Sequence, residues 1–256
     1  MAKASFRRLA LAGLKATLEP LVGLLPDAIE LRNVRVEVRR RAALPKDCED
    51  RFGYQRRFVA FEVTPGQKVL DIGSGAYPFP HATVLCDRFL DAGPHRHEAL
   101  VKNGVPFTVA AVECLPFRHR AFDFVYCSHV LEHVQDPILA CAEIARVARR
   151  GYIETPTFAK DVLLAWAAGM HRWHVVAAGS VLCFFEYSDR QLDGIRSPAW
   201  RDTVLGPWAH PLRDAFWNNQ DLFNVMFSWS DGFTVYVFAR DGSVRVQAVG
   251  SKLFPT

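Results

Sequence analysis

Val69-Leu70-Asp71-Ile72-Gly73-Ser74-Gly75 combines an apolar strand, an acidic residue near its end and two glycines one residue apart. Glycine lets the backbone take positive φ and pass close to a ligand, so the pattern predicts a strand followed by a nucleotide-binding turn. A dinucleotide fingerprint needs a third glycine three residues after Gly75, where Pro78 stands. Pro78 and Pro80 also prevent a helix from presenting its first N–H groups to a pyrophosphate, which argues against NAD.

The carboxylate of Asp71, placed just before the glycines, suits a ligand with a positively charged end such as an amino acid ammonium. This favours S-adenosylmethionine. Further motifs follow in order along the chain: Ala82-Thr83-Val84-Leu85-Cys86-Asp87, Glu113-Cys114-Leu115-Pro116-Phe117, Phe122 to Cys127, Ser128-His129-Val130-Leu131-Glu132-His133-Val134 with Asp136-Pro137, and Gly151 to Pro156. With these motifs, the chain from about Val69 to Pro156 resembles a class I S-adenosylmethionine-dependent methyltransferase of the type 11 subgroup.

The resemblance implies where the cofactor binds. Asp71, Gly73 and Gly75 would face its methionine and ribose side, Asp87 would accept hydrogen bonds from the ribose hydroxyls, and Glu113 would lie at the adenine. The complete set of implied cofactor-binding residues is Asp71, Gly73, Ser74, Gly75, Asp87, Glu113, Cys114 and Ser128.

Two positions depart from the family pattern. Tyr77 stands where the family usually has a third glycine, and the short distance from Asp71 to Asp87 predicts a proline-rich loop or a stunted helix between the first two strands. Ala111 replaces the aspartate that usually contacts the adenine amino group, so Glu113 or the backbone around Cys114 would have to supply that contact.

Methyl transfer from a sulfonium is an in-line displacement that depends on positioning, and an acceptor hydroxyl also needs a base. Each catalytic candidate also has a structural interpretation. His129 could make a structural hydrogen bond, His133 could orient its loop, and Glu154 could cap the following helix. His171 and His174 could belong to a segment that is anchored by Trp173. The resemblance implies that Glu132 and His133 could help to hold a metal, as in some relatives, but two residues make no site, so the sequence predicts no metal. The catalytic candidates are His129, His133, Glu154, His171 and His174.

Strands alternating with helices predict an α/β fold with a mostly parallel sheet. The resemblance implies a Rossmann-like sheet of seven strands with helices on both faces. Ser230-Asp231-Gly232 between two apolar runs is a hairpin signal, and it predicts that Phe223–Trp229 and Phe233–Phe238 form an antiparallel C-terminal hairpin of this sheet. We expect residues 1–46 to form an N-terminal helix and strand extension, and residues 47–256 a methyltransferase domain with a substrate lid inserted at about 157–220.

Smaller elements are predicted by the same patterns: a half-exposed strand over Val34, Val36 and Val38, and helices at Lys46–Glu62, Pro137–Arg149 and Leu163–Met170. Two short strands are expected between Trp173 and Tyr187.

The net charge of +4 and the lack of a long basic run interleaved with aromatics argue against a nucleic-acid partner. The six cysteines show no metal-ligand spacing and indicate a reducing, cytoplasmic compartment. Residues 1–25 suggest an amphipathic helix that packs on the domain or makes weak contact with a membrane surface.

We therefore expect an S-adenosylmethionine-dependent methyltransferase that methylates an oxygen atom of a small-molecule or sugar-containing (glycan-type) acceptor. Two alternatives remain open. One is a lapsed methyltransferase-like protein that binds a partner, suggested by Tyr77 and Ala111. The other is a membrane-surface methyltransferase of a lipid-linked sugar, suggested by the N-terminal segment and the basic run that ends at Arg41.

Overall fold

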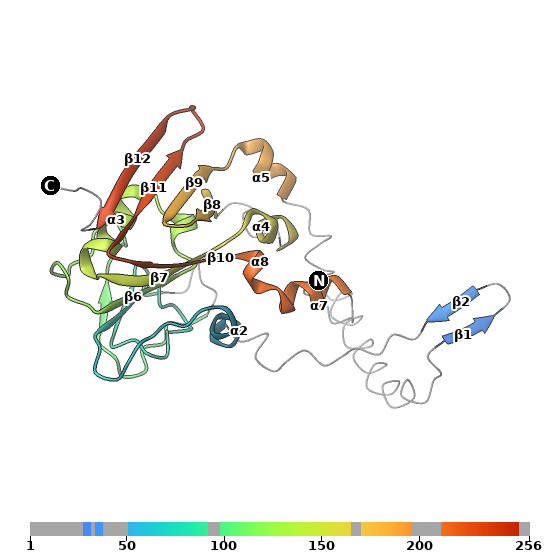
Figure 1. The fold of residues 1–256 in the computed structure, drawn as a ribbon, viewed down its shortest axis with the longest axis horizontal. Coiled ribbons are helices and arrows are strands. Elements are labelled where there is room, and N and C mark those ends of the chain that lie inside the picture. Colours follow the sequence, from blue (N-terminus) through green and yellow to red (C-terminus); the bar gives the residue numbers. More distant parts are fainter. Residues whose placement is uncertain are drawn as a thin grey trace. The chain divides into compact units, whose positions relative to one another are not determined.

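The computed structural model describes residues 28–31, 34–37, 51–91, 98–164, 170–195 and 211–250. The chain divides into two units, Met1–Ala43 and Leu44–Thr256. In the first unit, β1 (Ala28–Leu31) pairs antiparallel with β2 (Val34–Glu37), drawn in blue in Figure 1, and β2 confirms the predicted strand. The predicted N-terminal helix lies outside the described residues.

The second unit contains a six-stranded sheet in the order β10-β7-β6-β3-β4-β5. Neighbours from β5 to β7 pair parallel, and β10 pairs antiparallel with β7 at one edge, which confirms the predicted mostly parallel α/β sheet. Among the described residues the sheet has six strands, where the resemblance implied seven. Its strands are β3 (Val69–Ile72), β4 (Val84–Asp87), β5 (Phe107–Val109), β6 (Phe124–Ser128), β7 (Arg150–Pro156) and β10 (Asn224–Ser230).

The connection from β3 to β4 is fully described and contains no helix, as the prolines predicted. Between β6 and β7 the chain forms α3 (Pro137–Val147), whose first N–H groups, those of Ile138 and Leu139, donate to the Asp136 side chain. The helix ends before the predicted Arg149 because Arg150 already belongs to β7.

Gly151 follows Arg150 in this strand. It lies inside β7, where a Cβ atom would come within 2.5 Å of the carbonyl oxygen of Val125. Close approach of β6 and the Trp229 ring is the physical reason for glycine at this position.

Both faces of the central sheet are covered. On one face, alternate strand residues such as Leu70 and Val125 pack with α3 in the main core. On the other face, an aromatic cluster forms around Phe79, Phe124, Tyr126 and Tyr152, with Phe52 and Phe61 packed against it. The Phe79 and Tyr126 rings stack with their centroids 4.3 Å apart. The helix α2 (Arg51–Phe58) contributes Phe52 to this aromatic layer.

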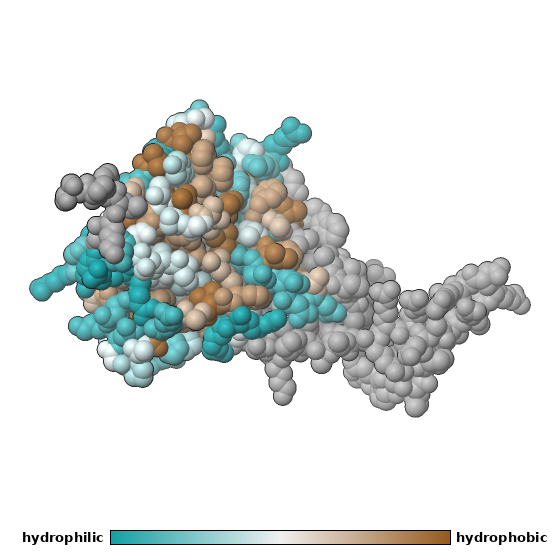
Figure 2. Space-filling view, viewed as in Figure 1, coloured by the Kyte–Doolittle hydropathy of each residue, from teal (hydrophilic) through white to brown (hydrophobic). Residues whose placement is uncertain are grey.

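A second, four-stranded sheet has the order β12-β11-β9-β8. Its strands are β8 (Trp173–Ala178), β9 (Val181–Glu186), β11 (Gly232–Phe238) and β12 (Val244–Gly250), and β8 and β9 confirm the two predicted short strands. The helix α3 packs against β11 and β12, so it lies between the two sheets (Figure 1). Figure 2 shows apolar surface over β11 and β12, where Val244 and Val246 of the edge strand are exposed.

The predicted C-terminal hairpin is wrong. Both strands exist, but β10 pairs with β7 of the central sheet, while β11 pairs antiparallel with β12 and parallel with β9. Residues 230–232 therefore form a corner at which the chain passes from one sheet to the other. At this corner Asp231 has a φ of 61° and its N–H donates to the carbonyl of Arg149. A turn sequence specifies a reversal, but not which strand edges it serves.

The remaining helices are α2 (Arg51–Phe58), the 3-10 turn η1 (Leu131–His133), α4 (Phe158–Leu164), α5 (Asp189–Ile195), α7 (Pro211–Asn218) and α8 (Gln220–Phe223). Here α2 lies within the predicted helix Lys46–Glu62, whereas α4 begins earlier than the predicted Leu163–Met170, most of which lies outside the described residues. Of the segment expected as a lid, β8 and β9 join the second sheet. Among the described helices, none has the length and apolarity to cross a bilayer.

Candidate active site

The strand order of the central sheet reverses between β3 and β6, the two strands from which the chain departs in opposite directions along the sheet. In open α/β sheets, ligands bind in the crevice outside the carboxyl ends of the strands at such a point. Gly73 follows β3 and His129 follows β6. The sequence-predicted residues at the ends of β3, β4, β6 and β7 therefore meet at one edge of the sheet.

The glycine turn is held by the end of β4. The N–H groups of Gly73 and Ser74 both donate to the carbonyl of Cys86, at 2.7 and 3.2 Å. Gly73 has a φ of 72°, and a Cβ atom there would lie 2.2 Å from Cγ2 of Val130. Glycine is thus required twice, once by the backbone conformation and once by the neighbouring loop after β6.

Asp71 is only 1% exposed, and its Oδ2 accepts the N–H of Phe79 at 2.7 Å. Burial raises the pKa of this carboxyl to about 7, although that hydrogen bond and the charge of Arg51 act in the opposite direction. A buried carboxylate that ionises with difficulty is stabilised by a cationic ligand. The site at Asp71 therefore fits the ammonium group of an amino acid.

Asp87 ends β4 and is also buried. Its two carboxylate oxygens accept the N–H groups of Gly75 and Phe89, at 3.0 and 2.8 Å. Ser74, between the two glycines, has a buried hydroxyl for which the described structure supplies no hydrogen-bond partner. A buried polar atom without a partner at a ligand-binding edge fits a polar ligand group placed beside it.

The residues expected near the adenine are already engaged within the protein. Glu113 accepts the N–H of Gln135 at 3.0 Å, so its carboxylate faces the loop after η1. Cys114 is exposed, and its N–H donates to the carbonyl of Ala111 at 3.0 Å in a turn. An adenine contact from either residue would have to displace or share one of these hydrogen bonds.

Glu154, near the end of β7, is fully buried and surrounded by donors. The hydroxyls of Tyr54 and Tyr152 and the amide of Gln55 donate to its carboxylate, and Ser128 Oγ lies 3.4 Å away. Burial opposes its ionisation, but the hydrogen bond and charge of His129, the charge of Lys160 and the other donors outweigh burial and lower its pKa to about 2. This carboxylate, surrounded by hydrogen-bond donors, is an anion that holds its neighbours in place.

His129 lies between two carboxylates. Its Nδ1 is 3.3 Å from Oε1 of Glu132 and its Nε2 is 3.2 Å from Oε1 of Glu154, so both ring nitrogens face acceptors. Its φ of 57° is in the left-handed region, which is rare for a residue other than glycine. Backbone strain of this kind is concentrated at functional sites. His129 is therefore fixed at the switch point by its backbone and both sides of its ring.

The other candidate histidines separate into two places. His133 and His171 pack edge to face with ring centroids 4.7 Å apart, next to Glu132. His174 instead stacks on Phe185, at 4.9 Å and 12° between the planes. Trp173 is buried, and its indole N–H donates to the carbonyl of Val134 at 2.8 Å, so this part of the cluster anchors β8.

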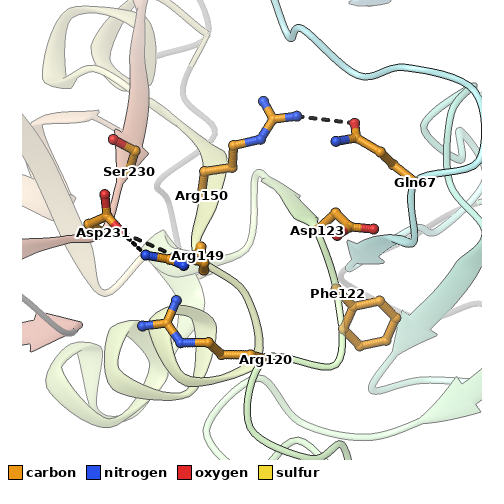
Figure 3. A pocket seen from close by; sticks show the side chains of 8 residues that line it. All are labelled: Gln67, Arg120, Phe122, Asp123, Arg149, Arg150, Ser230 and Asp231. Carbon is orange, nitrogen blue, oxygen red and sulfur yellow. Dashed lines mark hydrogen bonds and ion pairs between the residues drawn. The ribbon is translucent and has the colours of Figure 1, made fainter.

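A cavity of about 380 Å³ lies at the amino ends of the parallel strands, opposite to the carboxyl ends that carry the candidate site (Figure 3). Within it, Arg150 donates to Gln67 and Arg149 pairs with Asp231. Its residues lie at the amino ends of the parallel strands, whereas ligands of such sheets bind at the carboxyl ends. The cavity is lined by Gln67, Arg120, Phe122, Asp123, Arg149, Arg150, Ser230 and Asp231.

Several polar residues of the site were missed from the sequence. Tyr54, Gln55 and Tyr126 form a buried hydrogen-bonded layer under Glu154. In α4, buried Lys160 donates a hydrogen bond to Asn224, and buried Asp161 is hydrogen-bonded to His171. No sequence motif marked these tyrosines as part of a site. Only the alternation that places Tyr126, Ser128, Tyr152 and Glu154 on one face of two adjacent strands could have suggested a polar layer.

Part of this chain is similar to known methyltransferases. The family model described as a methyltransferase domain matches residues 81–153. A curated relative named demethylmenaquinone methyltransferase, from Streptomyces griseus, is 34% identical over 103 residues. That match covers 36% of this chain and 43% of the relative, so the chain spans less than half of the relative's length.

Two solved structures are similar to parts of this chain. A Thermotoga maritima protein described as a possible histamine N-methyltransferase is 24% identical, with 38% of this chain and 46% of that chain covered and a TM-score of 0.30. The YcgJ protein of Bacillus subtilis is 19% identical, with 66% and 90% covered and a TM-score of 0.34.

The matched residues 81–153 include β4, β5, β6 and the first part of β7. Several of the predicted motifs lie at the ends of these strands. Over residues 81–153, this chain is therefore similar to the methyltransferase domain described by that family model.

Proposed function

We propose that this protein transfers the methyl group of S-adenosylmethionine to an oxygen atom of a small-molecule acceptor. The observation that carries the proposal is the arrangement at the switch point. Two buried carboxylates, Asp71 and Asp87, flank a glycine turn that includes the unpartnered hydroxyl of Ser74. This set offers an anion for an ammonium group and acceptors for ribose hydroxyls.

When bound, S-adenosylmethionine supplies a methyl group on a sulfonium that an oxygen nucleophile can displace. The protein would hold the two reactants in line and control the acceptor's proton. Both ring nitrogens of His129 face carboxylate oxygens in this conformation. Rotation away from Glu132 or Glu154 would leave one nitrogen able to accept the acceptor's proton, and Glu154 would serve as the positioning residue.

A small acceptor is supported by the curated relative, whose name specifies demethylmenaquinone. Methylation on oxygen and a sugar-containing acceptor are supported only by the sequence resemblance. The partly buried ring of His174 stacks on Phe185, and the two residues lie on β8 and β9 of the second sheet.

Calorimetric titration with S-adenosylmethionine tests the cofactor site. We expect micromolar binding by the wild-type protein and its loss in Asp87→Ala. Asp241→Asn is the matched control, because Asp241 lies in the exposed turn between β11 and β12. Failure of the wild-type protein to bind at millimolar cofactor would favour the partner-binding alternative suggested by Ala111.

The acceptor is tested by incubating the protein with a panel of hydroxylated small molecules and methyl-labelled cofactor. Mass spectrometry would detect the gain of a methyl group, and NMR would distinguish a methoxy group from a methyl on nitrogen or carbon. A product methylated only on nitrogen or carbon would contradict the proposed reaction while leaving the cofactor site intact.

A further inference from the structure

Three side chains with metal-ligating atoms converge beside the candidate active site. Glu132 and His133 belong to η1, and His171 lies just before β8, 38 positions farther along the chain than His133. One ligand atom from each residue lies within 4.8 Å of the others. Methyl transfer as proposed above requires no metal. We propose that Glu132, His133 and His171 form a binding site for a divalent transition-metal ion, with Zn²⁺ as the probe.

The hydrogen bonds of the two histidines fix which nitrogen can bind a metal. Nδ1 of His133 lies 3.0 Å from the carbonyl oxygen of Met170, which can only accept, so Nδ1 must donate. Nδ1 of His171 lies 2.9 Å from Oδ1 of Asp161. In each neutral ring the lone pair is therefore on Nε2. For His133, this atom is 3.8 Å from Oε1 of Glu132.

Glu132 supplies the anionic ligand. Its side chain is 1% exposed, and its Oε1 is 3.3 Å from His129. Its second oxygen, Oε2, is buried and has no hydrogen-bond partner in the described structure. A buried carboxylate oxygen without a partner is costly unless a cation or donor is bound to it. This unmet requirement is the second observation, independent of the histidines, that points to a cation.

The outer contacts match those of known metal sites. Metal-binding histidines usually donate their other N–H to a carboxylate or a backbone carbonyl, which sets the tautomer and raises the basicity of the ligand nitrogen. His171 has the carboxylate of Asp161 in this role, and His133 has the carbonyl of Met170. Asp161 is itself held by the hydroxyl of Tyr187, at 2.7 Å.

The composition of the site selects the metal. Two imidazoles and a carboxylate suit zinc and neighbouring first-row ions better than Mg²⁺ or Ca²⁺, which prefer oxygen ligands alone. Ligand atoms around one tetrahedral Zn²⁺ lie about 3.4 Å apart, so binding would draw this group together by up to roughly 1.4 Å. Three protein ligands would leave a coordination position for water or for an oxygen atom of another molecule.

The test is titration of the chelator-treated, full-length protein with Zn²⁺, followed by calorimetry, and with Co²⁺, followed by its visible spectrum. We expect one ion per chain. His133→Gln and His171→Gln should each weaken Zn²⁺ binding at least 100-fold, and Asp161→Asn should weaken it about 10- to 100-fold through the orientation of His171. His174→Gln is the matched control, since His174 lies on β8 but stacks on Phe185 outside the group.

Circular dichroism and S-adenosylmethionine binding would show that each variant folds. If His171→Gln fails to fold, Glu132→Gln and Asp161→Asn carry the test. The proposal is overturned if the wild-type protein takes up no Zn²⁺, because the group is then an ion-pair network only. Equal affinity in His171→Gln, His174→Gln and the wild type would also overturn it. Neither result bears on cofactor binding, which is measured separately.

Discussion

Gly75 donates its backbone N–H to Oδ2 of Asp87 at 3.0 Å, while Oδ1 of the same carboxylate accepts the N–H of Phe89 at 2.8 Å. Gly75 belongs to the turn after β3, and Asp87 ends β4. One buried carboxylate thus joins the ends of two neighbouring parallel strands. Its position is fixed by the protein's own backbone, in advance of any ligand.

Replacing Asp87 should therefore reduce stability as well as cofactor binding. In Asp87→Ala the N–H groups of Gly75 and Phe89 lose their acceptors, and we expect the free energy of unfolding to fall by about 1–3 kcal/mol. Asp87→Asn keeps one acceptor oxygen and the side-chain shape, so it should lose less. Urea unfolding of the three proteins checks this. Equal stability of Asp87→Ala and the wild type would show that water replaces the carboxylate.

Gly73 and Gly104 form a matched pair. Their φ values are 72° and 71°, but a Cβ atom on Gly73 would meet Val130 at 2.2 Å, whereas one on Gly104 would meet nothing within 4 Å. Gly104→Ala should lower the free energy of unfolding by about 1–2 kcal/mol, the cost of a left-handed alanine. Gly73→Ala should lower it further because of the clash.

The double variant Gly73→Ala/Val130→Ala separates the two costs. Removal of the Val130 methyl groups should recover part of the loss seen in Gly73→Ala, as measured by urea unfolding. If Gly73→Ala and Gly104→Ala are equally destabilised, the loop after β6 moves freely and the proposed contact between the two loops is unimportant.

The raised pKa of Asp71 predicts an unusual dependence of protein stability on pH. Its folded pKa is raised by burial to about 7, from an ordinary value of 3.8, so the native state holds an extra proton between these two pH values. The free energy of unfolding should therefore fall as pH rises through this window. Asp71→Asn cannot ionise and keeps an oxygen to accept the N–H of Phe79.

The difference in unfolding free energy, Asp71→Asn minus wild type, should accordingly rise from about pH 4 to pH 7 and then level off, by a few kcal/mol at most. Urea unfolding at several pH values measures it, and the subtraction removes contributions common to both proteins. A difference that stays constant across the window would show that Asp71 ionises normally.

A substitution of Trp173 tests whether this residue anchors the segment His171 to His174. Its indole N–H donates to the carbonyl of Val134, its side chain is buried, and Arg172 lies over its ring at 5.1 Å. Trp173→Phe should lower the free energy of unfolding by about 1–3 kcal/mol through the lost hydrogen bond and volume. Affinity for S-adenosylmethionine should remain unchanged, since the strand ends of β3 and β4 are untouched. Unchanged thermal stability would contradict the anchoring role.

Much of the central sheet was predictable because its signals are local. Apolar runs at Lys68–Ile72, Val84–Asp87 and Phe122–Cys127 identified strands, and the prolines after Gly75 indicated a loop or a stunted helix in the next connection. Strand pairing was not predictable in the same way. The turn at Asp231 has the residues of a hairpin, yet β10 and β11 join different sheets. Edges far apart in the sequence were already available to each strand, and they decided the pairing.

The sequence by itself determined the α/β sheet, its glycine turn and the acidic strand ends, because periodicity and turn chemistry act over a few residues. Only the tertiary structure decided how the candidate side chains are used. It surrounded Glu154 with donors from α2 and β7, separated His174 from His171, and brought His171 to Glu132 and His133. Tyr54 and Glu154 are 100 residues apart in the sequence, and His133 and His171 are 38 apart. These relationships arise from packing of β8 against η1 and the central sheet, which no local pattern encodes.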